Sequence, residues 1–297
     1  LGGEMMLDAK AAEEGIRRRI AQPLKLGVAA AAQAIVDIAV SKMSLAVREV
    51  SVAKGYDPRD FALVASGGAG PLHALAIARE LHIPRVIVPL FPAHFSALGM
   101  LAADERHDFI RTFYADLGTV DFAELGRILA EMAAESAAVL KNRKDARHHI
   151  HLDLRYVGQE FTLPVPVAEK QVRAGDRKGI RAAFDRLYHQ RYAHHSPGEP
   201  VEIVNVRFAA VGKRAGMKFP RRPAKRRATP SRRVQAYLGA ARPVSCPVYR
   251  REDLGAGARI AGPALVREHG TTTVLFRGDV CKVVATGELL IAVGGEA

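Results

Sequence analysis

Three glycines at residues 67, 68 and 70 form the stretch whose spacing most clearly suggests binding chemistry. Gly67, Gly68 and Gly70 follow the apolar run 61–65, which predicts a short buried strand, and Pro71 suits the first turn of a helix. A strand, a glycine turn and a helix N-terminus expose free backbone N–H groups, so this arrangement can bind an anion such as phosphate. The spacing matches neither the dinucleotide-binding fingerprint nor the P-loop. A glycine turn that only allows a helix to approach a sheet is the alternative interpretation.

The elements on either side of the turn must hold it in place. A helix is predicted over residues 71–81 and a strand over 85–89, which together complete a β-α-β unit. A longer helix over about 28–54 has a wide apolar face, and Asp8 can cap an earlier helix. Residues 1–105 therefore predict an α/β domain that carries the glycine turn. A β-branched side chain at Gly70 would block close approach of a ligand and would resist a positive φ.

Residues 106–212 show a different order of elements. Alternating and helical apolar patterns predict strands and helices in the order β-α-β-β-α-β, which is that of a ferredoxin-like α+β domain. The predicted elements are a strand at 108–114, a helix at 122–142, strands at 149–157 and 160–167, a helix at 180–192 and a strand at 201–211.

Histidines in this domain raise the question of a metal site. His149 and His151 share one face of a predicted strand next to His148, and His194 and His195 lie in a predicted loop. No acid or cysteine stands at a spacing that completes a ligand set, so a solvated strand face is the favoured interpretation and no metal residue is assigned.

Positive charge is concentrated in one segment. The chain has 297 residues and a net charge of +13, and ten Lys or Arg residues with three prolines and no acid lie between Lys213 and Arg233. This composition predicts an exposed basic linker over residues 213–233. Phe219 is its one aromatic residue, so a base-stacking platform and a specific nucleic-acid function are disfavoured.

Residues 234–297 contain short apolar runs punctuated by Gly and Asp, which predict a small C-terminal β domain.

The chain shows no unbroken apolar run as long as a membrane span, and residues 1–8 lack the features of a signal peptide. Cys246 and Cys281 are the two cysteines, which suits a reducing cytoplasm. Residue 1 is not Met, and the start reads like the middle of a longer protein. No Ser-His-Asp order or pair of carboxylates suggests itself.

Several motifs together resemble one family. Their content and order are similar to those of the hydantoinase A / 5-oxoprolinase family, which includes acetone carboxylase-type β subunits. The motifs are Leu1-Gly-Gly-Glu-Met, Asp57-Pro-Arg-Asp-Phe-Ala-Leu-Val-Ala, Gly67-Gly-Ala-Gly-Pro-Leu-His-Ala, Phe95-Ser-Ala-Leu-Gly-Met, Arg155-Tyr-Val-Gly-Gln, Val201-Glu-Ile-Val-Asn and Ile260-Ala-Gly-Pro-Ala-Leu-Val.

The resemblance implies an actin/sugar-kinase-like fold, of which residues 1–105 would form part of the second lobe. It implies ATP, with Mg, as the cofactor and places Gly67, Gly68, Gly70 and His73 in the loop that faces the nucleotide. It also implies a B-type hydantoinase subunit as partner and a cyclic amide as substrate. The family's upstream Asp-x-Gly-Gly-Thr phosphate loops are absent here, so the chain resembles a C-terminal part that is inactive alone and lacks its N-terminal lobe.

The leading hypothesis is therefore the C-terminal portion of an ATP-dependent hydantoinase or 5-oxoprolinase-type subunit that activates a cyclic amide for hydrolysis. An acetone carboxylase-type β subunit is the alternative among enzymes. A non-catalytic assembly domain is the alternative of another class, and a nucleic-acid binder that uses the basic segment is the weakest. Ser66 and His94 depart from the residues that the family pattern favours at these positions.

Overall fold

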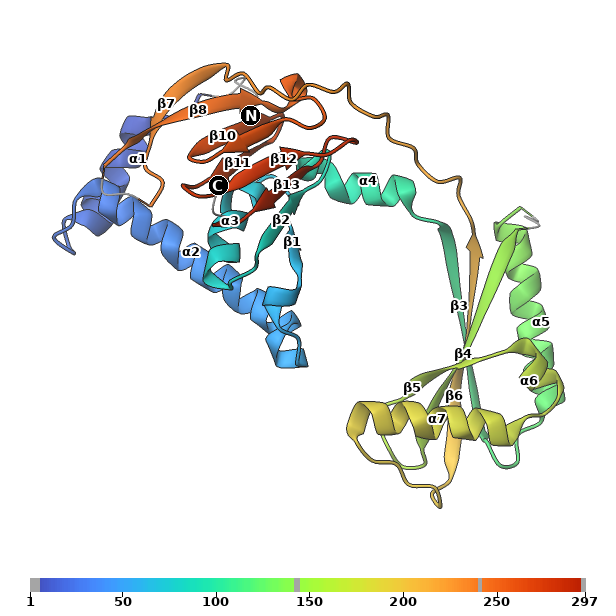
Figure 1. Cartoon of the computed structure of the whole chain (residues 1–297). Helices are drawn as coiled ribbons and strands as arrows, with labels where there is room; N and C mark the ends of the chain where they lie inside the picture. Colours follow the sequence, from blue (N-terminus) through green and yellow to red (C-terminus); the bar gives the residue numbers. More distant parts are fainter. Residues whose placement is uncertain (1–5, 142–144, 240–241, 295–297) are drawn as a thin grey trace. The chain divides into compact units, whose positions relative to one another are not determined.

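The computed structural model describes residues 6–141, 145–239 and 242–294. The chain divides into two compact units (Figure 1). Unit 1 combines Leu1–Leu101 with Lys218–Ala297, and unit 2 is Ala102–Met217. The motif at residues 1–5 and the predicted helix end at Asn142 lie outside the described residues.

A five-stranded sheet forms the centre of unit 1. Its order is β1 (Ala62–Val64), β2 (Arg85–Val88), β13 (Leu289–Ala292), β12 (Val280–Val283) and β9 (Arg259–Ala261). β1 and β2 run parallel, as the β-α-β prediction requires, and the remaining neighbours are antiparallel. The C-terminal segment therefore completes the sheet that the glycine-turn unit begins.

The predicted separate β domain at 234–297 is wrong. β13 pairs directly with β2, and Val86, Val88, Leu289 and Ile291 from the two strands are fully buried in one shared core. Strands this short enclose no core of their own, so they bury their side chains against a helix and a second sheet.

A second sheet and helix α3 (Gly70–Glu80) provide that cover. The sheet has the order β11-β10-β8-β7, and α3 lies against β11. Its strands are β7 (Arg232–Ala236), β8 (Val244–Arg250), β10 (Ala264–Glu268) and β11 (Thr271–Leu275).

The predicted burial of residues 61–65 is found only in part. Ala65 is buried, but Phe61 and Val64 are 50% and 51% exposed. The reason is position, because β1 is the edge strand of its sheet and pairs only with β2 among the described strands.

The remaining helices of unit 1 include one that is long and apolar. Helix α1 (Ala9–Ile16) is capped by the Asp8 carboxylate, which accepts from the Ala11 N–H at 2.9 Å, and leads into a π-helical turn. Helix α2 (Val28–Val50) begins a stretch to Lys54 that could span a bilayer by length and composition alone. Val40 is buried and Met43 and Val47 pack against the core, so α2 belongs to unit 1. Helix α4 (Phe95–Ala102) follows β2.

The predicted linker 213–233 is also wrong over most of its length. The Arg222 N–H donates to the Ala285 carbonyl at 2.8 Å, and the Lys225 N–H donates to the Ala256 carbonyl at 3.1 Å. Arg232 and Arg233 already belong to β7. The basic residues after Lys218 therefore lie along unit 1, and only a short connection at about 213–218 joins the units on this side.

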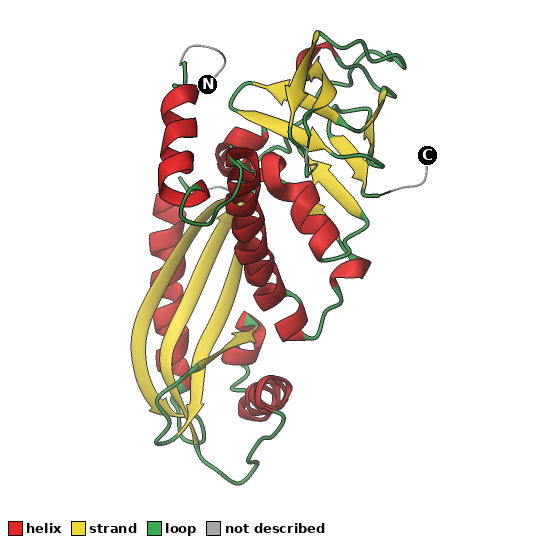
Figure 2. Cartoon of the chain, turned by 90° about the vertical axis from the view of Figure 1, so that its left-hand side faces the viewer, coloured by secondary structure: helices red, strands yellow, loops and turns green. Residues whose placement is uncertain are grey.

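Unit 2 is an antiparallel sheet with three helices, and Figure 2 shows its long curved strands. The sheet order is β3-β6-β4-β5. Its elements are β3 (Glu105–Asp116), α5 (Phe122–Val139), β4 (Ala146–Tyr156), β5 (Leu163–Val167), α6 (Glu169–Arg173), α7 (Arg177–Tyr192) and β6 (Val201–Gly212).

The predicted order of elements is found, with α6 added, but the sheet is not ferredoxin-like. A ferredoxin-like sheet places its first and third strands at the centre, whereas this sheet places its second and fourth there, β4 and β6. The burial pattern explains the difference. Phe113 is the one buried residue of β3, which suits an edge, whereas β6 buries residues along its whole length.

A buried arginine connects the parts of unit 1. Arg251 is 3% exposed, and its guanidinium donates to the carbonyls of Val88, Pro89 and Gly287 at 2.8–3.1 Å and to the Glu268 carboxylate at 2.7 Å. Burial raises the pKa of Glu268 and lowers that of Arg251, and their mutual attraction opposes both shifts. One side chain thus joins the end of β2, the β12–β13 turn and the end of β10.

We expect Arg251→Met to lower the free energy of unfolding by about 3–5 kcal/mol, because it leaves the Glu268 carboxylate buried without its partner. Arg250→Met is the matched control, since Arg250 has a 58% exposed side chain paired with Glu252 at the surface and should cost less than about 1 kcal/mol. Urea unfolding of both variants measures the difference. If both variants lower the free energy of unfolding by the same amount, the buried contacts of Arg251 add no more stability than a surface ion pair.

Limited trypsin digestion should cut first between Lys213 and Lys218, where the chain passes between the units. We expect the two fragments to stay together on gel filtration and to separate only in denaturant, because β13 remains paired with β2. Elution of the C-terminal fragment by itself would contradict the discontinuous unit, and a first cut at Arg127 within α5 would contradict the unit boundary.

Candidate nucleotide site

Backbone geometry explains the first glycine of the turn. The Ala65 N–H donates to the Ile87 carbonyl at 2.8 Å, which extends the β1–β2 pairing up to the turn. Gly67 then adopts φ +89°, and its N–H donates to the Pro92 carbonyl at 2.7 Å. A side chain is strained at this φ, so the positive φ that the sequence assigned to Gly70 belongs to Gly67.

Close approach of the C-terminal hairpin explains the second glycine. A Cβ atom at Gly68 would lie 3.3 Å from the Gly270 carbonyl oxygen, in the turn between β10 and β11. Gly270 has φ +82°, and a Cβ atom there would lie 2.9 Å from the Ala93 Cβ. The turn therefore sits between the 3-10 helix Pro92–His94 and the β10–β11 hairpin, two segments distant from each other in the sequence.

The third glycine has no such explanation within the chain. Gly70 is the first residue of α3, its φ is not positive, and a Cβ atom there would make only an ordinary contact, 3.7 Å from the Ala65 carbonyl carbon. No side chain caps α3, and among the described residues the amides of Gly68, Ala69 and Gly70 have no hydrogen-bond acceptor. Three unpaired donors at a helix N-terminus can hold an anionic oxygen.

The fourth predicted residue lies elsewhere. His73 lines a cavity of about 670 Å³ between α2, α3 and residues 237–239, together with Asp37, Arg79 and Phe276. None of the three glycines lines this cavity. The structure therefore groups Gly67, Gly68 and Gly70 and places His73 on a different surface of α3.

Two histidines that sequence reasoning did not assign lie beside the turn. The rings of His94 and His269 are stacked, with centroids 6.3 Å apart and planes 14° apart. His94 is close to the glycines in the sequence, but its residue type departs from the family pattern. His269 is far away in the sequence, and no local signal links the β10–β11 turn to the glycines.

A buried ion pair fixes the opposite end of α3. Arg79 donates two hydrogen bonds, of 2.6 and 3.0 Å, to the carboxylate of Asp279, which is fully buried. The same carboxylate accepts from the N–H groups of Phe276 and Gly294. With its C-terminal end held in this way, α3 presents its N-terminus in a fixed direction.

The histidines of unit 2 form no metal centre within the described ranges. No group of three or more His, Cys, Asp or Glu side chains there could hold a metal ion. His151 stands opposite Arg207 in the β4–β6 pairing, and burial and nearby cations lower its pKa. Arg207 donates to the buried Asp153 carboxylate at 2.7 Å. The predicted solvated strand face is therefore found only in part, because Asp153 on this face is fully buried and His151 is partly buried.

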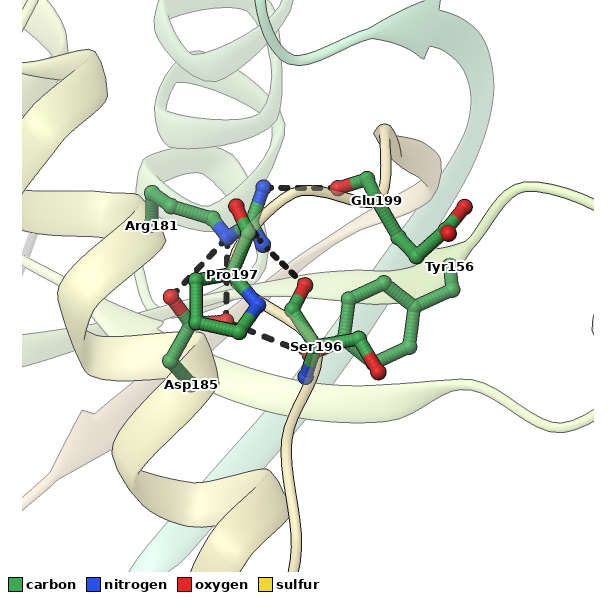
Figure 3. A network of polar contacts seen from close by, with 6 residues as sticks. All are labelled: Tyr156, Arg181, Asp185, Ser196, Pro197 and Glu199. Carbon is green, nitrogen blue, oxygen red and sulfur yellow. Dashed lines mark hydrogen bonds and ion pairs between the residues drawn. The ribbon is translucent and has the colours of Figure 1, made fainter.

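A polar network in unit 2 has a structural role (Figure 3). Arg181 donates to the Asp185 carboxylate and to the carbonyls of Ser196, Pro197 and Glu199 at 2.8–3.0 Å, and the Tyr156 hydroxyl accepts from the Ser196 N–H. A cavity of about 530 Å³ adjoins the network. Each guanidinium nitrogen of Arg181 already donates to the helix or to the loop, so this arginine anchors the loop at residues 196–199.

Comparison with known proteins identifies the family. The hydantoinase/oxoprolinase family model matches residues 1–109, and the model of the hydantoinase/oxoprolinase C-terminal domain matches residues 121–285. The chain is 29% identical to caprolactamase subunit alpha of Pseudomonas jessenii over 93% of its own length and 41% of that subunit. It is also 29% identical to 5-oxoprolinase 1 of Arabidopsis thaliana, over 86% of its own length and 20% of that protein.

A solved structure supports the same assignment. The nucleotide-free structure of acetone carboxylase, from a study of ATP-dependent acetone carboxylation, superposes with a TM-score of 0.79 at 25% identity and covers 98% of this chain and 44% of that one. The mixed α/β fold is therefore shared, and the chain spans less than half the length of these relatives. With both family models matched in succession along its length, the chain belongs to the hydantoinase/oxoprolinase family.

Proposed function

We propose that this chain is the C-terminal portion of an ATP-dependent hydantoinase/oxoprolinase-type subunit and that residues 67–70 face the phosphates of the nucleotide. The observation that carries the proposal is the set of three unpaired amides at Gly68, Ala69 and Gly70, at a glycine position that the chain's own packing does not require. In this proposal, unit 1 contributes part of the second lobe of an actin-like fold.

The apolar surface of unit 1 supports the view that further protein belongs beside it. β1 is a sheet edge with half-exposed apolar side chains, and Ile38 and Leu45 on α2 are each 60% exposed. Surfaces of this kind are covered in complete proteins. The longer relatives contain chain that could supply the cover, including the opposite wall of the nucleotide site.

Activation of an amide by ATP depends mainly on positioning and on neutralising the phosphate charge. In the complete enzyme ATP would phosphorylate the carbonyl oxygen of a cyclic amide, and Mg would accompany the nucleotide. The residues of this chain would contribute backbone N–H donors and the positive end of α3.

His73 remains a proposed contact of the nucleotide, although it lies on another surface of α3. We place the enzyme in the cytoplasm with a B-type hydantoinase subunit as its partner.

A carboxylase subunit is the second candidate, because the acetone carboxylase structure superposes over nearly the whole chain. In that case the activated group would be an enol oxygen. A substrate screen of the complete assembly, with hydantoins, lactams and ketones, separates the two. A non-catalytic assembly domain would bind no nucleotide at the turn.

ADP should bind weakly at the turn in this chain, with a dissociation constant on the order of millimolar, about 4 kcal/mol, because one wall of a cleft supplies few contacts. Amide NMR should show shifts at residues 66–73. Gly70→Val should abolish them while leaving the fold intact, because a Cβ atom there meets no tight contact within the chain.

Gly126→Val is the matched control, since Gly126 is also in a helix and faces open space in unit 2. It should leave ADP binding unchanged. If millimolar ADP moves no amide of the turn in the wild type, the glycines are structural and the proposed function fails. If Gly70→Val only destabilises the fold and ADP binding persists, Gly70 serves packing.

The purified chain should not turn over ATP or hydantoins, because half of an ATP site cannot align the nucleotide with its acceptor. A coupled ADP-release assay on the wild type and Gly70→Val measures this. A steady ATPase rate in the wild type that Gly70→Val removes would show that the chain contains a complete catalytic site.

A further inference from the structure

Two imidazoles without partners stand next to the glycine turn. His94 and His269 are exposed, and among the described residues none of their ring nitrogens has a hydrogen-bond partner. Their rings lie nearly parallel with centroids 6.3 Å apart. Neither side chain is needed for packing, so their position calls for another explanation.

Contacts between three segments bring the pair to the turn. The Cε1 atom of His94 lies 3.8 Å from the position that a Cβ atom on Gly270 would occupy. The carbonyl oxygen of Gly270 lies 3.3 Å from the position that a Cβ atom on Gly68 would occupy. Phe91 has φ +50°, a strained value for this residue, and directs the chain into the short helix that carries His94. The backbone therefore places both histidines beside the unpaired amides.

Polar groups on the hairpin add to this environment. His269 also lines a cavity of about 340 Å³ with Arg250, Arg267 and two glutamates, Glu252 and Glu268. Both glutamates already pair with arginines, Arg250 and Arg251. Thr271 is 8% exposed, and its hydroxyl has no hydrogen-bond partner within the described ranges. With both glutamates paired to other arginines, Arg267 leaves a net positive charge beside the hairpin turn.

We propose that His94 and His269 together bind a phosphate group of a di- or triphosphate held at the glycine turn. The proposal rests on the proposed function and adds the side chains that recognise the anion. Two neighbouring imidazole side chains offer ring N–H donors that can reach the same anion. Imidazolium N–H groups also form charge-assisted hydrogen bonds to phosphate oxygens.

The test is an NMR titration of the labelled chain with inorganic pyrophosphate, which lacks the nucleoside. We expect the imidazole resonances of His94 and His269 to shift together with the amides of Gly68–Gly70. His94→Asn and His269→Asn should each weaken binding about tenfold, the effect of losing one hydrogen bond to a charged group. Both side chains are exposed, so the variants should fold.

His195→Asn is the matched control, because His195 also stands against a second histidine, His189, with ring centroids 5.5 Å apart, but in unit 2. It should bind pyrophosphate as the wild type does. Turn amides that shift while the imidazoles stay still, or unchanged affinity in both Asn variants, would overturn the histidine proposal and leave the proposed function standing. If the imidazole resonances shift but the turn amides do not, the histidine pair binds pyrophosphate and the glycine turn is not a phosphate site. No shift at either place would overturn both.

Discussion

Arg251 is buried, so its charge must be balanced by other groups of unit 1, and these groups hold the parts of the unit together. Its guanidinium joins carbonyls at the end of β2 and in the β12–β13 turn to a carboxylate at the end of β10. These groups come from both ends of the chain, so a charge buried by one segment is satisfied by the others. Removing any of these partners would leave a buried charge unbalanced and would lower the free energy of unfolding. The stability of unit 1 therefore depends on correct packing of the β2 segment against the C-terminal segment.

The same meeting of distant segments builds the candidate site. The glycine turn is local and was predicted from its own residues, because strand, glycine and Pro71 signals lie side by side. The cap at Asp8 was predictable for the same reason and is confirmed. Gly68, however, owes its lack of a side chain to Gly270, and His94 faces His269. Contacts of this kind depend on how sheets pair, which the local pattern does not determine.

Strand pairing accounts for the other errors. Short apolar runs after residue 234 predict strands correctly but do not reveal that β13 joins β2 instead of closing a separate domain. In unit 2 the order of elements was predictable, yet two sheet orders fit it, and the burial of β6 and exposure of β3 select between them. The basic segment was interpreted from charge alone, whereas its backbone hydrogen bonds to residues 256 and 285 fix it on unit 1.

The discontinuous unit has a consequence for synthesis on the ribosome. β2 ends at Val88, but its neighbour β13 begins at Leu289, so the central sheet cannot close until about 200 further residues have been synthesised. Unit 2 is continuous and can fold as soon as β6 emerges. One edge of β2 therefore stays unpaired while the inserted unit is made, and an unpaired apolar edge of this kind is prone to aggregation.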